Sequence, residues 1–225
     1  LTKIVLIGSL LFFTWLNMFS TYQFSLGVLW SENGNWEYYK SIIGKTELSY
    51  NDLVRFDSGE PQPTKATYVR TLHENNFVDS LGVNYTRQYR TDSLSYVYHL
   101  TPKNNYFPSY KTTIAAANLK AGDWLRVSAK CFRKHKGVNL YRTNIMVTTF
   151  ERKKQSLKWR MLRLDNKIAN PKSSLWGGKA NVWHEVAYFV QVPLNIQEKD
   201  LFKTYIWNNK VPDIYLDDFK VEVWR

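Results

Sequence analysis

The stretch DIYLDDFKVEVWR, residues 213–225, decides the fold and raises a problem of charge. Side chains alternate between the two faces of a β-strand. Such a strand places one carboxylate on an otherwise apolar face, which consists of Tyr215, Asp217, Phe219, Val221 and Val223. A buried carboxylate without a partner is costly. We therefore expect Asp217 to contact a cation, a metal ion or several N–H donors, and Asp218 to lie on the opposite face.

The chain upstream of this stretch, from residue 56 onward, repeats the pattern of short strands. The runs are rich in aromatic and β-branched residues, and turn sequences such as NLKAGD (118–123) and NNKVPD (208–213) separate them. No long helical window interrupts the series, which indicates an antiparallel β-sandwich. The ten runs are ATYVRTL, VNYTRQYR, SLSYVYHL, YKTTIAAANL, WLRVSAKCF, VNLYRTNIMVTTF, LKWRMLRL, VWHEVAYFVQV, DLFKTYIWN and DIYLDDFKVEVW.

Three segments resemble, in their order, parts of galactose-binding-like jelly rolls, the fold of many carbohydrate-binding modules. They are NLKAGDWLRVSAKCF (118–132), GGKANVWHEVAYFVQVP (177–193) and DIYLDDFKVEV (213–223). The resemblance implies an all-β jelly-roll sandwich over residues 56–225. It also implies a structural Ca²⁺ ion, since the closing-strand Asp of this family often joins an acid in a Phe-Glu-x-Gly turn.

The ligands that the resemblance implies for this ion are Asp217 and Asp57, the latter in the sequence FDSGEP (56–61). Asp57 is one methylene shorter than the family's Glu, which departs from the pattern. Calcium requires six to eight oxygen ligands, and backbone carbonyls would complete the number. Two alternatives are a pair between Asp217 and a Lys or Arg side chain, and a set of turn amides.

The first 55 residues differ from the rest, because they predict helices. Residues 4–22 are mostly apolar and long enough to cross a bilayer, so we predict a transmembrane helix within 1–30. A signal peptide and a buried core helix are the alternatives. Residues 31–55 predict a short amphipathic juxtamembrane helix with Asn35 as its N-cap. The turn-rich segment 56–65 then begins the sandwich.

The N-terminal stretch also resembles the last membrane helix of large bacterial polytopic membrane proteins related to lipid-linked-sugar glycosyltransferases. Some of these end in an extracytoplasmic β-domain. Lys3 is the only charge before Glu32. This charge favours an N-terminus inside the cell and a β-domain outside the cytoplasm, in the periplasm or at the cell surface.

Positive charge is concentrated in one part of the chain. Residues 121–165 contain twelve basic and three acidic residues, whereas residues 1–60 contain four basic and six acidic ones. If the strands of this basic segment share a sheet, they form one cationic face that suits an anionic polymer. A solvated face without a ligand is the alternative. The expected residues of the face are Arg126, Lys130, Arg142, Asn144 and Arg160.

Trp176 is the aromatic residue that we expect to be exposed, because it lies in a long loop and precedes Gly177 and Gly178. An exposed indole ring can stack on a sugar. A Trp side chain that fills the loop is the alternative.

The sequence contains no pattern that indicates catalysis. Its four histidines lack the spacing of metal ligands, and neither a phosphate-binding loop nor a nucleophile elbow is present. Cys131 is the single cysteine, which excludes an internal disulfide and a Cys-based zinc site.

We therefore expect a non-catalytic, membrane-tethered extracytoplasmic module that binds a glycan or an anionic cell-envelope polymer. The alternative is a structural or interaction subunit, or a C-terminal accessory domain, of a larger membrane assembly with other protein subunits. We expect no nucleic-acid partner, since the membrane helix places the domain away from most nucleic acid.

Overall fold

The computed structural model describes residues 2–29, 35–58, 60, 63–76, 84–89, 96–107, 110–134, 143–164, 167–168 and 181–225. Within these residues it contains the helices α1 (Thr2–Ser25), α2 (Trp36–Ile42) and α3 (Tyr50–Ser58). The strands are β1 (Tyr68–Asn75), β2 (Tyr85–Thr86), β3 (Val97–Leu100), β4 (Tyr110–Thr113), β5 (Trp124–Phe132), β6 (Asn144–Arg152), β7 (Gln155–Arg163), β8 (Trp183–Gln191), β9 (Leu201–Asn208) and β10 (Ile214–Trp224).

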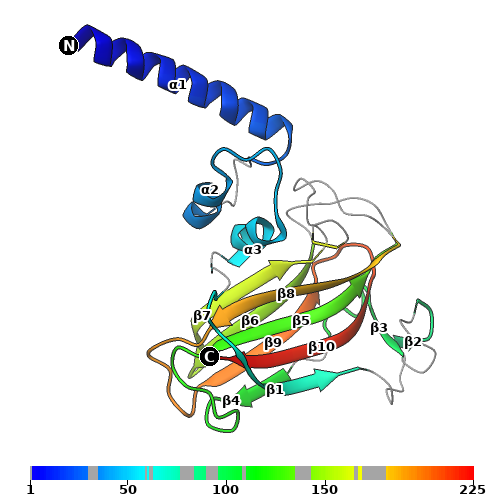
Figure 1. Cartoon of the computed structure of the whole chain (residues 1–225). Coiled ribbons are helices and arrows are strands. Elements are labelled where there is room, and N and C mark those ends of the chain that lie inside the picture. Colours follow the sequence, from blue (N-terminus) through cyan, green and yellow to red (C-terminus); the bar gives the residue numbers. More distant parts are fainter. Residues whose placement is uncertain are drawn as a thin grey trace.

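The strands form two antiparallel sheets that pack face to face (Figure 1). The first sheet has the order β2-β3-β10-β5-β8, with β1 also paired to β10, and the second has the order β4-β9-β6-β7. A large apolar core between them includes Val127, Phe150, Phe202 and Phe219, all of which are buried. Each described strand lies within one of the predicted runs or overlaps it. The predicted all-β jelly-roll sandwich is confirmed.

The alternation of β10 breaks at a β-bulge, and this corrects one prediction. Asp217 pairs with Lys130 and Lys220 pairs with Ser128, so two residues of β10 lie opposite one residue of β5. Asp218 takes the left-handed φ of 47° that the bulge requires. Asp217 therefore does not share the face of Phe219, as strict alternation predicted. The side chain of Asp217 is nevertheless buried, as we expected from the sequence, with only 1% of the residue exposed.

Helix α1 extends away from the other elements, and α2 and α3 lie between it and the sandwich (Figure 1). Its side chains from Lys3 to Trp15 are all exposed. Lys3–Ser25 is long and apolar enough to cross a membrane, with a mean hydropathy of 1.7. No other element of the described residues covers this apolar surface.

A second, small core connects α1 to the two short helices. It comprises the buried residues Val28, Tyr38, Ile42, Leu48, Leu53 and Phe56. The predicted N-cap is confirmed, because the Asn35 side chain accepts a hydrogen bond of 2.9 Å from the Tyr38 N–H. Helix α3 runs into the segment 56–65, where we placed the start of the sandwich. Phe56 belongs to the small core, whereas Val54, two residues earlier, packs into the sandwich core.

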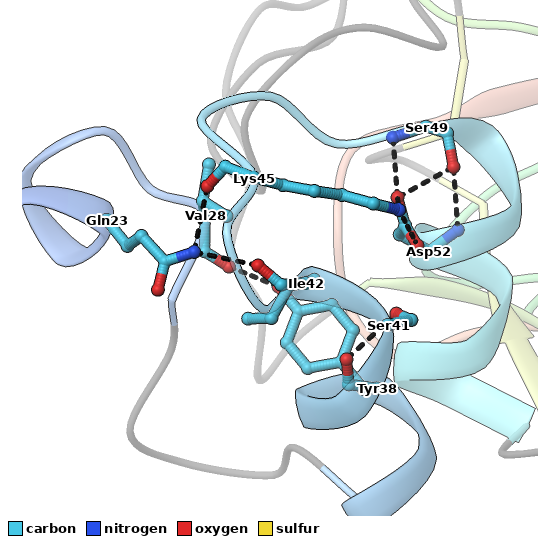
Figure 2. A network of polar contacts seen from close by, with 8 residues as sticks. All are labelled: Gln23, Val28, Tyr38, Ser41, Ile42, Lys45, Ser49 and Asp52. Carbon is cyan, nitrogen blue, oxygen red and sulfur yellow. Dashed lines mark hydrogen bonds and ion pairs between the residues drawn. The ribbon is translucent and has the colours of Figure 1, made fainter. Parts of the chain in front are cut away.

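Polar contacts close the small core at the end of α1 (Figure 2). The Gln23 side chain donates hydrogen bonds of 2.8 Å to the carbonyls of Ile42 and Lys45. The Tyr38 hydroxyl donates to the carbonyl of Val28. These bonds satisfy carbonyls where α1 and α2 end, and they hold the last turn of α1 against α2.

Asp52, at the start of α3, is buried and its carboxylate accepts several hydrogen bonds (Figure 2). Its carboxylate accepts hydrogen bonds from the Lys45 ammonium at 2.8 Å and from the Ser49 N–H at 2.9 Å. Burial alone would raise the pKa of Asp52, but the hydrogen bonds from Lys45 and Ser49 outweigh it and hold the pKa below its ordinary value.

The lowered pKa of Asp52 predicts acid-labile stability. Stability from Asp52 is fully present above its unfolded-state pKa of about 3.9 and is lost as the pH falls through the lower folded-state pKa. We expect Asp52→Asn to flatten the fall in the free energy of unfolding between pH 5 and pH 2, as measured by urea denaturation. An unchanged pH dependence in this variant would show that Asp52 contributes none of the acid lability.

Candidate functional site

The predicted calcium ligand Asp57 has cations as its partners. Its carboxylate accepts hydrogen bonds from the Arg163 N–H at 2.7 Å and from the Arg163 guanidinium at 3.0 Å. The Lys167 ammonium also contacts it. The side chains of Asp57 and Lys167 are completely buried. The carboxylate is therefore satisfied by an ion-pair cluster that joins α3 to the end of β7.

Asp217 lies on β10 and accepts a hydrogen bond of 2.8 Å from the N–H of Asp218 at the bulge. The described residues contain no group of three or more His, Cys, Asp and Glu side chains placed to hold a metal ion. The calcium ion stays a prediction, and the cations around Asp57 do not favour Asp57 as one of its ligands.

The described residues of the predicted cationic face are divided between the two sheets. Arg126 and Lys130 lie on β5 in the first sheet, whereas Asn144 and Arg160 lie on β6 and β7 in the second. The prediction assumed that the three strands share a sheet, and this assumption was wrong. Asn144 is also completely buried.

The three described cations of the predicted face pair with acids from elsewhere in the chain. The Arg126 guanidinium pairs with Glu222 at 2.8 Å and also contacts Glu185. The Lys130 ammonium pairs with Asp218 at 2.6 Å. Arg160 donates to Glu60 at 3.1 Å. The remaining two predicted ligand-binding residues, Arg142 and Trp176, lie outside the described residues.

The outer surface of the second sheet carries a group of aromatic rings that the sequence reasoning did not single out. On β9, Phe202, Thr204 and Ile206 are buried toward the core, so Tyr205 and Trp207 point outward. Tyr106 forms an isolated bridge with Trp207. Trp159 on β7 lies opposite Thr149 of β6. We call Tyr106, Trp159, Tyr205 and Trp207 the aromatic face.

Tyr106 contacts both Tyr205 and Trp207, and the rings of the aromatic face remain accessible. Tyr106 stacks on Trp207 with a centroid separation of 6.2 Å and an interplanar angle of 11°, and it lies 5.9 Å from Tyr205. Tyr106 is 53% exposed and Trp159 is 47% exposed. Large exposed aromatic side chains grouped on one face are typical of an interaction site.

Strand β6 lies between the ring-bearing strands β7 and β9, and its outward side chains are smaller than the rings. The outward residues of β6, which are Ile145, Val147 and Thr149, are buried, although no strand covers them on that side in the described part of the chain. They pair with the ring-bearing strands β7 and β9 on either side. The charged residues at the end of this strand are paired, Glu151 with Lys203 of β9 and Arg152 with Asp200. The aromatic face is thus a largely neutral surface.

A signal for the aromatic face was present in the run LFKTYIWN (201–208). It alternates apolar residues on one face with Tyr205 and Trp207 on the other. Both faces are therefore partly hydrophobic, and periodicity alone cannot show which one is turned to solvent.

A separate cavity of about 640 Å³ lies between α3 and β8. Its lining includes Arg55, Glu60, Arg126, His184 and Glu185. Burial lowers the pKa of His184, which favours the neutral imidazole. Glu60 contacts Lys158 and Arg160, and Glu185 contacts Arg126, so both carboxylates take part in ion pairs that hold the fold together. Each carboxylate in the described lining of the cavity is thus already ion-paired with a residue of the chain.

Comparison with known proteins shows similarity of the backbone fold to solved structures at low sequence identity. No protein-family model matches the chain, and no curated protein matches it. Similar solved structures include the CBM22-2 xylan-binding domain of Paenibacillus barcinonensis Xyn10C, with 10% identity and a TM-score of 0.41 over 67% of this chain and 98% of that one. The C-terminal family 22 module of Clostridium thermocellum Xyn10B has 11% identity and a TM-score of 0.44 over 72% and 97%. The fold assignment rests on the two sheets themselves.

The ion-pair cluster around Asp57 generates a stability prediction. Asp57→Ala leaves Lys167 buried without its counter-charge, and the loss of one member of a buried pair typically costs about 3–5 kcal/mol. We expect the free energy of unfolding, measured by chemical denaturation, to fall by this amount. Glu37→Ala, which removes an exposed pair with Lys40, is the control and should change it by no more than about 1 kcal/mol. Equal effects of the two substitutions would contradict the role of the cluster.

Proposed function

We propose that this chain is a non-catalytic, membrane-tethered module that binds a glycan on the aromatic face. The observation that carries the proposal is the group of ordered, solvent-accessible rings on the outer surface of the second sheet. Exposed aromatic side chains on a rigid strand cost solvation free energy that a monomer in water does not recover. A ligand that covers the rings would recover it.

The chemistry of the face suits a sugar chain. One side of a pyranose ring presents aliphatic C–H groups, which carry partial positive charge and stack on the electron-rich face of an indole or phenol ring. The stacked pair Tyr106 and Trp207 offers such ring faces from neighbouring segments, and Trp159 offers another across β6. Charge on the face is compensated, which favours a neutral glycan over an anionic polymer.

The tether of the proposal is helix α1. Its exposed apolar surface is long enough to cross the hydrocarbon core of a bilayer, about 30 Å thick. The domain would then be displayed at the periplasmic side or the cell surface. The resemblance of this helix to the last helix of glycosyltransferase-like membrane proteins stays a prediction. So does an assembly with other membrane subunits, for which the aromatic face would be a docking surface.

The aromatic face generates a binding prediction. Removing one stacking ring should weaken binding to a neutral β-linked polysaccharide about tenfold, or about 1.4 kcal/mol. The variants are Tyr106→Ala, Trp159→Ala and Trp207→Ala, measured by affinity electrophoresis or calorimetry after a glycan array has selected the ligand. Tyr68→Ala is the matched control, because Tyr68 on the first sheet is also 53% exposed. Equal loss in the control, or tight glycan binding by all variants, would refute the site.

Salt dependence separates the neutral ligand from an anionic one. Electrostatic attraction is screened over about 8 Å at physiological ionic strength, whereas stacking is not. We expect the affinity at 0.5 M NaCl to remain within about twofold of that at 0.05 M. A steep loss with salt would instead favour an acidic polymer held by lysine and arginine side chains. Copurification of a membrane protein without any glycan binding would favour the docking role.

The tether generates a topology prediction. The chain should stay in the membrane fraction after extraction with alkaline carbonate, and deletion of residues 1–25 should release it. With Lys3 on the inner side, protease added to intact spheroplasts should degrade residues 60–225. Full protection of these residues, with degradation after lysis, would place the sandwich on the inner side.

A further inference from the structure

Helix α2 has one face that no described element covers. Tyr38 and Ile42 point into the small core, and the opposite side carries Trp36, which is 70% exposed, Lys40, and Ile43 at the C-cap, which is 76% exposed. Positions i, i+4 and i+7 share one side of a helix. We call Trp36, Lys40 and Ile43 the outer face of α2.

The outer face of α2 has a fixed position relative to α1. The side chain of Gln23, in the last turn of α1, donates hydrogen bonds to the carbonyls of Ile42 and Lys45, which flank Ile43 (Figure 2). The apolar surface of α1 includes Tyr22 and Phe24 next to this junction, and both are exposed. The exposed apolar surface thus continues from the end of α1 to the adjoining end of α2.

The chemistry of this face fits the boundary between lipid and water. Trp is enriched at membrane interfaces because its ring is apolar and its N–H is polar. Lys40 has an apolar stem, and its ammonium lies 5.6 Å from the Trp36 ring centroid and 2.6 Å from a Glu37 carboxylate oxygen. Such a side chain can bury its stem and keep its charge in the headgroup layer.

We propose that the outer face of α2 lies in the interfacial layer of the bilayer that α1 spans, so that the module contacts the membrane at two places. This inference rests on the proposed membrane tether. The second contact fixes the tilt of the sandwich, because α3 links the small core to β7 and β8. The Tyr50 hydroxyl bonds the backbone N–H of Ala187 at 2.7 Å, and Asp57 pairs with Arg163 at 3.0 Å. The glycan-binding module is therefore held at a set orientation and does not swivel on a flexible stalk.

The experiment uses the full chain reconstituted in phosphatidylcholine vesicles, with one cysteine introduced at a time in the variants Trp36→Cys and Ile43→Cys. Leu194→Cys is the control, because Leu194 is strongly exposed on the sandwich, and Cys131 is buried. Labelling by a membrane-impermeant maleimide should be at least about tenfold slower at 36 and 43 than at 194, because lipid excludes the reagent. A bimane fluorophore introduced at 36 or 43 in detergent should be quenched by brominated acyl chains after reconstitution, and one at 194 should not.

Three other outcomes would count against the inference in different ways. Equal labelling at all three positions, with the protein still floating with the vesicles, would overturn the inference and leave the tether intact. Slow labelling at 36 and 43 without quenching by brominated lipid would overturn it in favour of a second copy of the chain as the partner. Protein that does not float with the vesicles would refute the tether, and the inference with it.

Discussion

A buried carboxylate, Asp57, holds the two parts of the molecule together. It lies at the end of α3 and pairs with Arg163 and Lys167. Arg163 is the last residue of β7, and Lys167 lies in the segment just after it. Since an unpaired charge in the interior is costly, the cluster favours the attachment of α3 to the end of β7. Helix α3 consequently serves two cores at once, with Phe56 in the small core and Val54 in the sandwich core. The direction of α1 is thereby coupled to that of the sandwich.

The two outer surfaces of the sandwich are built from different chemistry. On the first sheet, the outward side chains of β5 and β10 satisfy one another, as in the pair between Arg126 and Glu222. On the second sheet, the outward side chains of β9 include the rings of Tyr205 and Trp207, while the inward ones, such as Phe202 and Ile206, fill the core. A strand that is apolar on both faces is expected where both faces are covered. The outer cover of β9 is not supplied by another strand in the described chain, which is why a ligand is the natural partner for its rings.

The sequence predicted the elements better than their arrangement. Alternation and turn residues place the strands, and the N-cap at Asn35 follows from its own side-chain oxygen, which can accept from a free backbone N–H of the first turn. Strand pairing could not be predicted in the same way, because periodicity does not specify which strands share a sheet. Arg126 and Arg160 were therefore assigned to one surface although they lie on different sheets. The bulge at Asp218 was not predicted for a related reason. One extra residue in β10 reverses the alternation of its side chains, and the sequence pattern does not mark which residue is the extra one.

Acids within the fold neutralise part of the basic excess in residues 121–165. Cations of this segment pair with acids from distant parts of the chain, such as Lys158 with Glu60 and Arg152 with Asp200. Part of the charge that is unbalanced along the sequence is thus paired in space, and Asp57 and Glu60 of the first 60 residues supply part of the compensation. These ion pairs join strands of the basic segment to neighbouring strands, to loops and to α3, and so contribute to holding the fold together. A local charge excess in a sandwich protein therefore indicates a polyanion site only when its counter-charges are absent from the rest of the chain.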